Sequence, residues 1–258
     1  MSKSIQRSIE NLGALLFELS IAERLMILTN LNREALKLSH LAQRQNMTVT
    51  ETLRNIQRLT NADLIFKDVE NVYKITPYGQ LILSLLPTLG FVVENRKYFK
   101  EHDTSALPTE FVARFGELSR FTFREEPISN FVYHEKMFTE AEEFCWMAST
   151  QFHYNAPQIA TEILKKGIDV RTLLPENVTP PVGVRPIEGV KRRTLPNFNM
   201  VVHVTEKEAA FGLPYLNGKM DYAQYFSKDP NFLKWCRDLY QYYWDRAKPM
   251  LGSFPNQH

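Results

Sequence analysis

Apolar residues in the first third of the chain recur at three- and four-residue spacing, which is typical of amphipathic helices. The pattern predicts one helix from Leu15 to Leu31 and a short second helix from Ser39 to Gln45, followed by a turn at Asn46 and Met47. The short helix carries a small residue, Ala42, where another helix can cross closely. Two helices are therefore expected before residue 48, and the turn at 46–47 leads from the second of them into the next element.

A third helix is predicted to begin at Thr48. A threonine three residues before Glu51 has the spacing of a capping box, in which the two side chains satisfy each other's backbone N–H groups. Apolar spacing predicts a buried stripe made of Val49, Leu53, Ile56 and Leu59. The opposite face is polar and carries Thr50, Glu51, Arg54, Asn55, Arg58 and Asn61.

Two short β runs follow, from Leu64 to Lys67 and from Val72 to Ile75, and the polar turn 68–71 between them predicts a hairpin. Thr76 followed by Pro77 predicts a helix start, and the helix should run towards Phe99. This long helix carries more apolar surface than a small domain can cover, which predicts subunit pairing. Its repeating apolar residues are Leu81, Leu85, Leu89 and Val92.

The second half of the chain has the pattern of an α/β domain. The segment 102–109 is rich in turn formers and predicts a linker. A strand from Phe144 to Thr150, a helix from Pro157 to Lys166 and a strand from Ile168 to Leu174 predict a βαβ unit with parallel strands. Strands are also expected at 200–204 and 209–213, with an aromatic-rich helix at 231–246.

These elements predict a mixed α+β and α/β fold with three parts. Residues 1–76 form a winged helix-turn-helix, 77–101 a linker and dimerisation helix, and 102–258 an α/β regulatory domain. A length of 258 residues is in keeping with two domains.

Composition narrows the class of protein. With 44% hydrophobic and 23% charged residues, a folded globular protein is expected. The N-terminus lacks the apolar segment of a secretory signal, and the apolar run 81–93 is short and interrupted by Pro87 and Gly90, so a cytoplasmic protein without a membrane span is expected. The two cysteines lie far apart in sequence, and neither a disulfide, a metal site nor a cofactor is expected.

Charge alone says little about partners, because the net charge is +2. Residues 1–79 hold ten Lys and Arg against eight Asp and Glu, and the rest of the chain holds equal numbers of basic and acidic residues. A DNA-binding interpretation therefore depends on where the basic side chains point.

The order helix, turn, helix, hairpin predicts DNA binding, because a recognition helix needs one buried face and one face that can hydrogen-bond base edges and phosphates. A solvated helix face is the alternative. The residues expected to contact double-stranded DNA are Arg44, Thr48, Thr50, Arg54, Asn55, Arg58, Lys67, Asn71 and Lys74.

Longer segments resemble known families. The run LKLSHLAQRQNMTVTETLRNIQRLTNADLIFKD and the following VYKITPYGQLIL resemble the winged helix of archaeal regulators related to the ArsR and MarR groups, with Thr76 and Gly79 matching their Thr-x-x-Gly helix start. The segments HDTSALPTEFVARFGEL, KKGIDVRTLLP and LPYLNGKMDYAQYFSKDPNFLKWCRDLYQYYWDRA resemble the ligand-binding domain of archaeal Fil-type methanogenesis regulators. The resemblance implies a transcription regulator with a sensing domain.

The C-terminal part is also similar, more distantly, to the phospholipase-D-like sensor domain of TrmB-type sugar regulators. Phospholipase D enzymes use paired His-x-Lys-x4-Asp motifs, and here His134 and Lys136 have the first spacing while Ala141 stands at the aspartate position. A histidine without these partners has little with which to build catalysis, so no enzyme activity is expected.

A small effector is expected in the second domain, because ligands of parallel α/β layers tend to lie beyond the carboxyl ends of the strands. The aromatic residues there could line a cavity or simply form the core, and the basic run 191–193 could bind an anion or be solvated. The effector-binding residues expected are Trp146, His153, Tyr154, Arg171, Arg193 and Asp221.

The sequence thus predicts a homodimeric, DNA-binding transcription regulator whose affinity for its operator depends on a small effector. The alternative is a winged helix that docks onto transcription machinery and binds DNA weakly and without sequence preference. Neither reading identifies the effector, or tells repression from activation.

Overall fold

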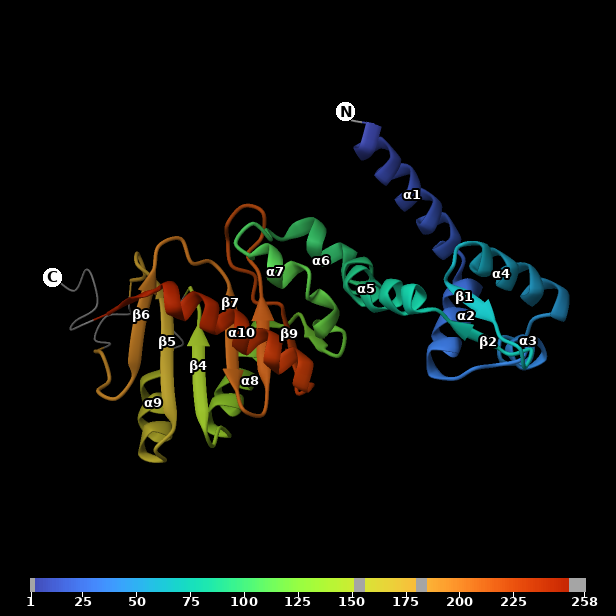
Figure 1. The fold of residues 1–258 in the computed structure, drawn as a ribbon. Helices are drawn as coiled ribbons and strands as arrows, with labels where there is room; N and C mark the ends of the chain where they lie inside the picture. The colour runs from blue at the N-terminus through green and yellow to red at the C-terminus, as the bar shows by residue number, and fades with distance from the viewer. Residues whose placement is uncertain (1–2, 151–155, 180–184, 251–258) are drawn as a thin grey trace. The chain divides into compact units, whose positions relative to one another are not determined.

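Figure 1 shows the chain as a computed structural model, which describes residues 3–150, 156–179 and 185–250. The chain divides into two compact units, Met1–Leu86 and Pro87–His258. Helix α5 (Pro77–Glu94) contains the point of division. Each unit has an apolar core of its own.

The first unit is built from helices and one hairpin. Its elements before α5 are α1 (Lys3–Leu19), α2 (Ala22–Arg33), α3 (Leu38–Arg44), α4 (Val49–Asn61), β1 (Ile65–Lys67) and β2 (Tyr73–Ile75). The two strands pair antiparallel, and Asn46 takes the positive φ of 52° that the turn before α4 requires. The short helix, the capped helix and the hairpin predicted between residues 39 and 75 are confirmed at these positions.

The single helix predicted from Leu15 to Leu31 is wrong. The chain breaks between α1 and α2, where the Ser20 hydroxyl donates to the Phe17 carbonyl at 2.8 Å and Ile21 takes an extended conformation. A serine that bonds its own helix backbone competes with helix propagation, which the apolar period does not reveal. Leu19 is the buried residue of α1, and the rest of that helix is largely exposed.

The second unit is an eight-stranded mixed sheet covered by helices. The strand order is β10-β6-β5-β4-β7-β8-β9-β3, in which β4, β5 and β6 are parallel and the other neighbours antiparallel. The strands are β3 (Thr122–Arg124), β4 (Phe144–Ala148), β5 (Asp169–Pro175), β6 (Lys191–Leu195), β7 (Val201–Thr205), β8 (Ala209–Gly212), β9 (Gln224–Ser227) and β10 (Lys248–Pro249).

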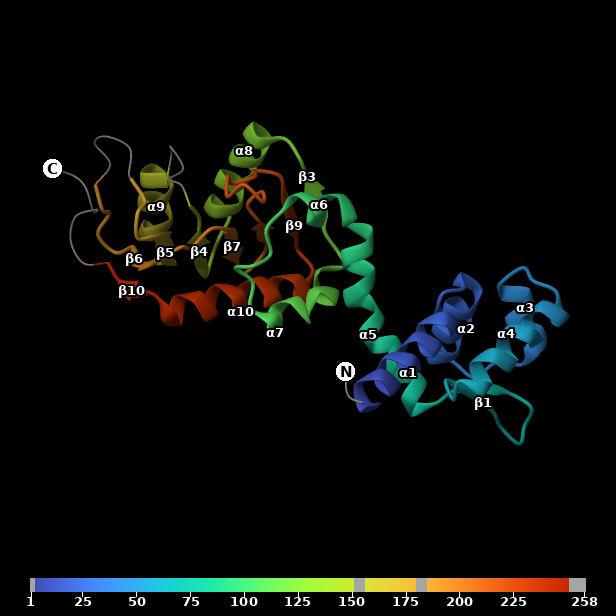
Figure 2. The same cartoon turned by 90° about the horizontal axis from the view of Figure 1, so that it is seen from above.

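Helices lie on both faces of this sheet. In Figure 2, α8 (Pro127–Thr139) and α9 (Ala156–Lys165) lie on one face, while α10 (Pro230–Arg246) and α7 (Thr109–Val112) lie on the other. The succession of β4, α9 and β5 confirms the predicted βαβ unit. The strand β6 was not predicted, because its residues are charged rather than apolar.

The segment 102–109 is part of the second unit rather than a linker. Phe91 and Tyr98 are buried in the core of that unit, and so are His102 and Leu107 within the expected linker. The Tyr98 hydroxyl accepts a hydrogen bond from the backbone N–H of Leu213 at 2.7 Å. Turn-forming residues can thus be held in a core when neighbouring aromatic residues anchor them.

The long helix predicted from Pro77 towards Phe99 is interrupted. Helix α5 ends at Glu94, and α6 (Arg96–Glu101) continues after Asn95, whose side-chain amide donates to the Phe91 carbonyl at 2.8 Å. The start is as predicted, since the Thr76 hydroxyl accepts from the backbone N–H of Gly79 at 2.9 Å. Among the described residues, no helix is long and apolar enough to cross a membrane.

Candidate nucleic-acid interface

Helix α4 begins with the capping box that the sequence predicts. The Thr48 hydroxyl accepts from the backbone N–H of Glu51 at 3.2 Å, and the Glu51 carboxylate accepts from the backbone N–H of Thr48 at 3.0 Å. The Thr48 hydroxyl also donates to the Glu51 carboxylate at 2.7 Å, and this hydrogen bond, followed by that from the Thr48 backbone N–H and by the charge of Arg54, lowers the pKa of Glu51. The side chain of Thr48, expected to contact DNA, is therefore used to hold the helix start.

The buried face of α4 differs from the prediction. Thr52, Ile56 and Leu59 are buried, whereas Val49 is 53% exposed and Leu53 is 41% exposed. Thr52 can lie in the core because its hydroxyl donates a hydrogen bond to the Thr48 carbonyl at 2.9 Å. Its buried hydroxyl is therefore not left unsatisfied. At 100° per residue, Leu53 lies about 60° outside the face that the buried positions define, whereas Val49 lies at the edge of that face and is exposed as the first residue of the helix.

The face opposite the core presents groups that can recognise base edges. The exposed side of α4 carries four such side chains on adjoining helical turns, each one or three residues after the one before. They are Thr50, Leu53, Arg54 and Gln57. Within the described part of the chain, Arg54 makes no hydrogen bond or ion pair. Gln57 was not among the residues expected to contact DNA, and Leu53 was expected to be buried, although the spacing of both from Thr50 was a signal of their exposure.

Arg58 does not have the free side chain expected of a base-reading residue. Its guanidinium binds both carboxylate oxygens of Glu18 in α1, with the Nε–Oε2 distance at 3.0 Å. It also lies over the Phe17 ring, 5.5 Å from the centroid, and Arg24 pairs with the same carboxylate. Arg58 therefore ties α4 to the end of α1.

Charged side chains of the hairpin also pair with one another. The Lys74 ammonium lies 2.7 Å from an Asp68 carboxylate oxygen, and Asp68 accepts from the backbone N–H groups of Glu70 and Val72. The Lys74 hydrogen bond is the largest cause of the lowered pKa of Asp68, and the same contact raises the pKa of Lys74. Asn71 supplies the positive φ of 62° that the turn needs.

The remaining expected DNA contacts fall into two groups. Arg44 is paired with Glu34 at 2.8 Å, and Asn55 is half-buried on the flank of α4. Lys67 is exposed with its ammonium 5.8 Å from the centroid of the Tyr73 ring. The basic side chains of the predicted interface that remain without a carboxylate partner, among the described residues, are thus Arg54 and Lys67.

In the second unit, three of the expected effector-binding residues lie together on neighbouring strands. The Arg171 guanidinium lies 4.3 Å from the centroid of the Trp146 ring, and that of Arg193 lies 4.7 Å from the Trp244 ring. Asp169 binds Arg171 and Lys191, each at 2.7 Å, and accepts from the Trp146 indole N–H. Each of these side chains therefore already has an interaction partner within the second unit.

Asp221, another expected effector-binding residue, lies apart from that cluster. It precedes β9, and β7 and β8 separate β9 from β4. The Asp221 carboxylate accepts from the His102 ring at 2.9 Å. His153 and Tyr154 lie outside the described residues, so the convergence of polar side chains on one cavity stays a prediction.

The His-x-Lys pair does not form a joint site. His134 is buried in α8, where Nε2 bonds Gln224 at 2.8 Å and Nδ1 lies 3.1 Å from Nδ1 of His203. Lys136 is exposed and lies 3.8 Å from Glu140. The two side chains of the motif therefore point to different surroundings. No group of three or more His, Cys, Asp or Glu side chains that could hold a metal is found among the residues that the structure describes.

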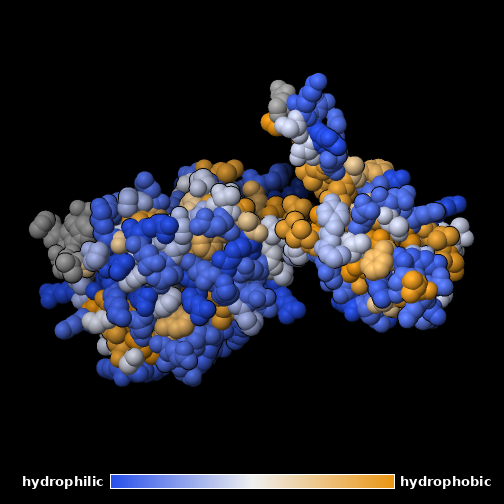
Figure 3. Space-filling model, in the orientation of Figure 1, coloured by the Kyte–Doolittle hydropathy of each residue, from blue (hydrophilic) through white to orange (hydrophobic). Residues whose placement is uncertain are grey.

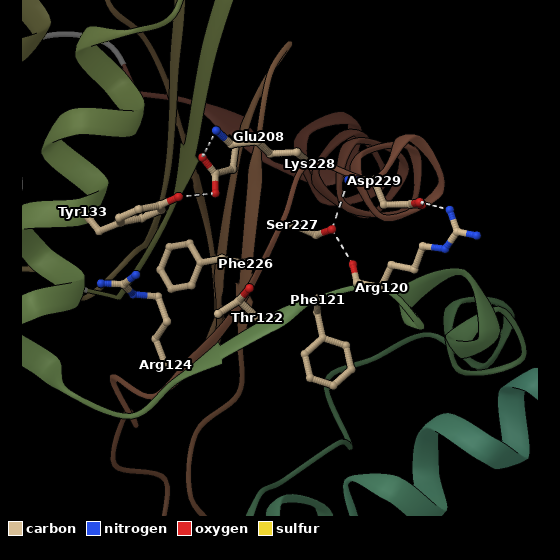
Figure 4. Close-up of a pocket in the computed structure, with 10 residues that line it drawn as sticks. All are labelled: Arg120, Phe121, Thr122, Arg124, Tyr133, Glu208, Phe226, Ser227, Lys228 and Asp229. Atoms are coloured by element: carbon tan, nitrogen blue, oxygen red, sulfur yellow. Dashed lines mark hydrogen bonds and ion pairs between the residues drawn. The ribbon is translucent and has the colours of Figure 1, made fainter.

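A cavity of about 480 Å³ opens beside β3 and β9, at the start of α10. Figure 4 shows that its charged side chains do not converge: Arg120 reaches towards Asp229, and Tyr133 donates to Glu208. Asp229 also caps α10 by accepting from the backbone N–H of Asn231. The full lining is Arg120, Phe121, Thr122, Arg124, Tyr133, Glu208, Phe226, Ser227, Lys228 and Asp229.

Comparison with known proteins gives weak likenesses. No family model and no curated protein matches the chain. The structure is similar to that of TrmBL2, an archaeal chromatin protein, at 17% identity and a TM-score of 0.44, over 86% of this chain and 91% of TrmBL2. About half of the chain, 51%, is similar to NucT from Helicobacter pylori (13% identity, TM-score 0.41, 99% of NucT) and to the phospholipase D family member Nuc from Salmonella typhimurium (14%, 0.36, 96% of Nuc). Likeness of this size does not carry a function from these proteins to this chain.

Proposed function

We propose that this chain is a transcription regulator that binds double-stranded DNA through a winged helix-turn-helix at residues 1–76. One observation carries the proposal: a capped helix, α4, follows a short helix and turn and shows Thr50, Arg54 and Gln57 on the face opposite its core. These are groups that hydrogen-bond base edges in the major groove. The hairpin that follows α4 supplies the wing.

In this proposal the N-terminal half of α4 enters the major groove. Arg54 is the side chain suited to bind a guanine, because a guanidinium can donate to both O6 and N7 of that base. Gln57 is one turn further along and suits an adenine. Lys67 on β1 is placed to contact a phosphate, which fixes register and not sequence.

A homodimer is part of the proposal, because a two-fold symmetric protein matches a two-fold symmetric operator. Leu81, Leu85 and Leu89 of α5 are each more than half exposed, and Figure 3 shows apolar side chains at the surface over α5. Val92, expected to continue this stripe, instead packs against the core of the second unit, and Val93 takes the exposed position. Exposed leucines at this spacing are suited to pair with a second copy.

The second unit is proposed to be regulatory and to take a small effector. Its cavity of about 480 Å³ is within the range of roughly 300–1,000 Å³ that small ligands occupy. The resemblance of residues 213–247 to Fil-type regulators supports the same role.

The test is binding to DNA of mixed sequence. Full-length protein is incubated with a library of random duplexes, bound duplexes are recovered and the selection is repeated. A sequence-specific regulator enriches a two-fold symmetric motif, whereas the docking-module alternative gives weak binding and no motif. Screening small anions and sugars for a rise in melting temperature, followed by titration with the enriched duplex, then tests the effector.

A further inference from the structure

Helix α4 exposes two apolar side chains where its polar recognition face begins. Val49 is 53% exposed and Leu53 is 41% exposed, one turn apart. Scattered apolar residues on a surface are common and need no explanation. These two matter because of their neighbours, Thr50 and Arg54, which are also exposed.

The side chains around Leu53 indicate the chemistry of the partner. Arg54 carries a positive charge with no hydrogen bond or ion pair among the described residues, so an anionic partner complements it. Gln57, one turn further along, offers an amide that both donates and accepts. Leu53 directly precedes Arg54 and lies on the side of Gln57 away from it, so a partner with an apolar group beside its charged and hydrogen-bonding groups complements all three side chains. The major groove of DNA combines all three, because it lies between phosphates, displays hydrogen-bonding base edges and presents one apolar group, the 5-methyl of thymine.

We infer that Leu53 and Val49 contact thymine 5-methyl groups, so that the duplex recognised by this chain contains thymine next to the guanine bound by Arg54. This inference rests on the proposed DNA-binding function and adds the base composition of its site. Contact with the methyl group removes apolar surface of both partners from water, whereas cytosine or uracil at that position leaves Leu53 facing a polar base edge.

The test removes the methyl group and nothing else. The duplex enriched from the random library is remade with each thymine replaced in turn by uracil, which forms the same hydrogen bonds. At one or two positions the affinity of the wild-type protein should fall about three- to tenfold, the size expected when one methyl group is removed from an apolar contact. Leu53→Ala should bind the thymine and uracil duplexes with equal affinity at the position that Leu53 contacts, and should keep the penalty at the position that Val49 contacts.

A matched control separates this effect from a general loss of apolar surface. Leu216→Ala removes a leucine of the second unit that is 68% exposed, against 41% for Leu53, and should keep the full thymine preference. Val49→Ala gives an independent second variant. If a variant folds poorly, the uracil series on the wild-type protein still tests whether the methyl group contributes to affinity.

The outcomes distinguish the inference from the proposal beneath it. Failure to enrich any motif overturns the DNA-binding function itself. An enriched motif whose affinity is the same with uracil at every position overturns only the thymine contact. A uracil penalty that persists at the same position in both Leu53→Ala and Val49→Ala shows that other side chains read the methyl group, and also overturns the inference.

Discussion

Arg58 and Glu18, forty residues apart in the chain, join α4 to α1 through two hydrogen bonds between the guanidinium and the carboxylate. The Glu18 side chain is largely buried, and its carboxylate also forms an ion pair with Arg24. Two of the basic side chains of the first unit are therefore bound to one carboxylate. The exposed basic residue of α4 that remains for a partner is Arg54.

The first prediction separates these two arginines. Arg54→Ala should weaken binding to the enriched duplex by about tenfold, because a base-reading arginine contributes roughly 1–3 kcal/mol of discrimination. Its melting temperature should change little, since Arg54 makes no hydrogen bond or ion pair among the described residues and acts only through its charge on Glu51. Arg58→Ala should instead lower the melting temperature, because it leaves Glu18 with fewer donors. Titrated mobility shifts and thermal melts of the same samples measure both effects, and equal affinity of Arg54→Ala and wild type would refute the assignment.

The second prediction concerns subunit pairing through α5. Leu85→Glu places a charge in the proposed apolar interface, where desolvation is costly. Sedimentation velocity should show a shift from dimer to monomer, accompanied by weaker binding to the duplex. Gln80→Glu, an exposed change on the same helix, serves as the control and should leave the dimer intact. A stable dimer of Leu85→Glu would show that the subunits pair through a surface other than α5.

The third prediction is a dependence of stability on pH at Asp169. Burial alone raises the pKa of Asp169, but hydrogen bonds from Lys191 and Trp146 and the charge of Arg171 outweigh it and lower the pKa below its ordinary value. A carboxylate with a lowered pKa in the folded state stabilises the fold above its ordinary pKa, and this contribution is lost as the pH falls through the folded value.

Asp169→Asn should therefore melt about 2–4 °C below wild type at pH 7, the shift expected for roughly 1 kcal/mol in a unit of this size. The difference should shrink as the pH falls below the ordinary value of 3.8. Thermal melts of wild type and variant across this range measure it. A difference that stays constant down to strongly acidic pH would contradict the proposed role of the carboxylate charge.

The fourth prediction concerns the buried contact between His102 and Asp221. Nδ1 of His102 lies 2.7 Å from the Tyr98 carbonyl and Nε2 lies 2.9 Å from the Asp221 carboxylate. Both ring nitrogens thus face hydrogen-bond acceptors. His102→Phe leaves the Asp221 carboxylate without that partner and should lower the free energy of unfolding by about 1–3 kcal/mol.

The double variant His102→Phe with Asp221→Leu removes both partners of the contact and should recover part of this loss, because the unpaired carboxylate is gone. Denaturant unfolding of the wild type, both single variants and the double variant measures the coupling. Strictly additive losses would show that the two side chains act independently.

Local signals predicted much of the first unit, and long-range pairing explains what they missed. The capping box at Thr48 and the hairpin turn at 68–71 depend on residues close in sequence, and both are present. The buried face of α4 could not be read from apolar spacing, because Thr52 is made compatible with the core by a hydrogen bond to its own helix. The partner of Arg58 lies in a helix whose end the apolar period did not reveal.

The same distinction holds in the second unit. A strand, a helix and a second strand predicted the parallel pair of β4 and β5, since the connection is local. The order of the eight strands depends on pairings that no short segment encodes, and the charged strand β6 has no apolar period to mark it. Trp146, Arg171 and Arg193 lie on neighbouring strands, but the stacking of Arg171 on Trp146 and of Arg193 on Trp244 was invisible in the sequence.

The internal pairing of Arg44 with Glu34, Arg58 with Glu18 and Lys74 with Asp68 has a consequence for the ionic atmosphere around bound DNA. A protein that neutralises phosphates releases condensed cations, and its affinity then falls steeply as salt is added, with a slope of about −0.9 per phosphate contact in a double-logarithmic plot. Here the protein's own carboxylates already neutralise three of the basic side chains, which leaves Arg54 and Lys67 to exchange with cations. The slope per subunit should therefore be shallow, about −2 at most. Such a regulator would distinguish one sequence from another nearly as well in concentrated salt as in dilute buffer.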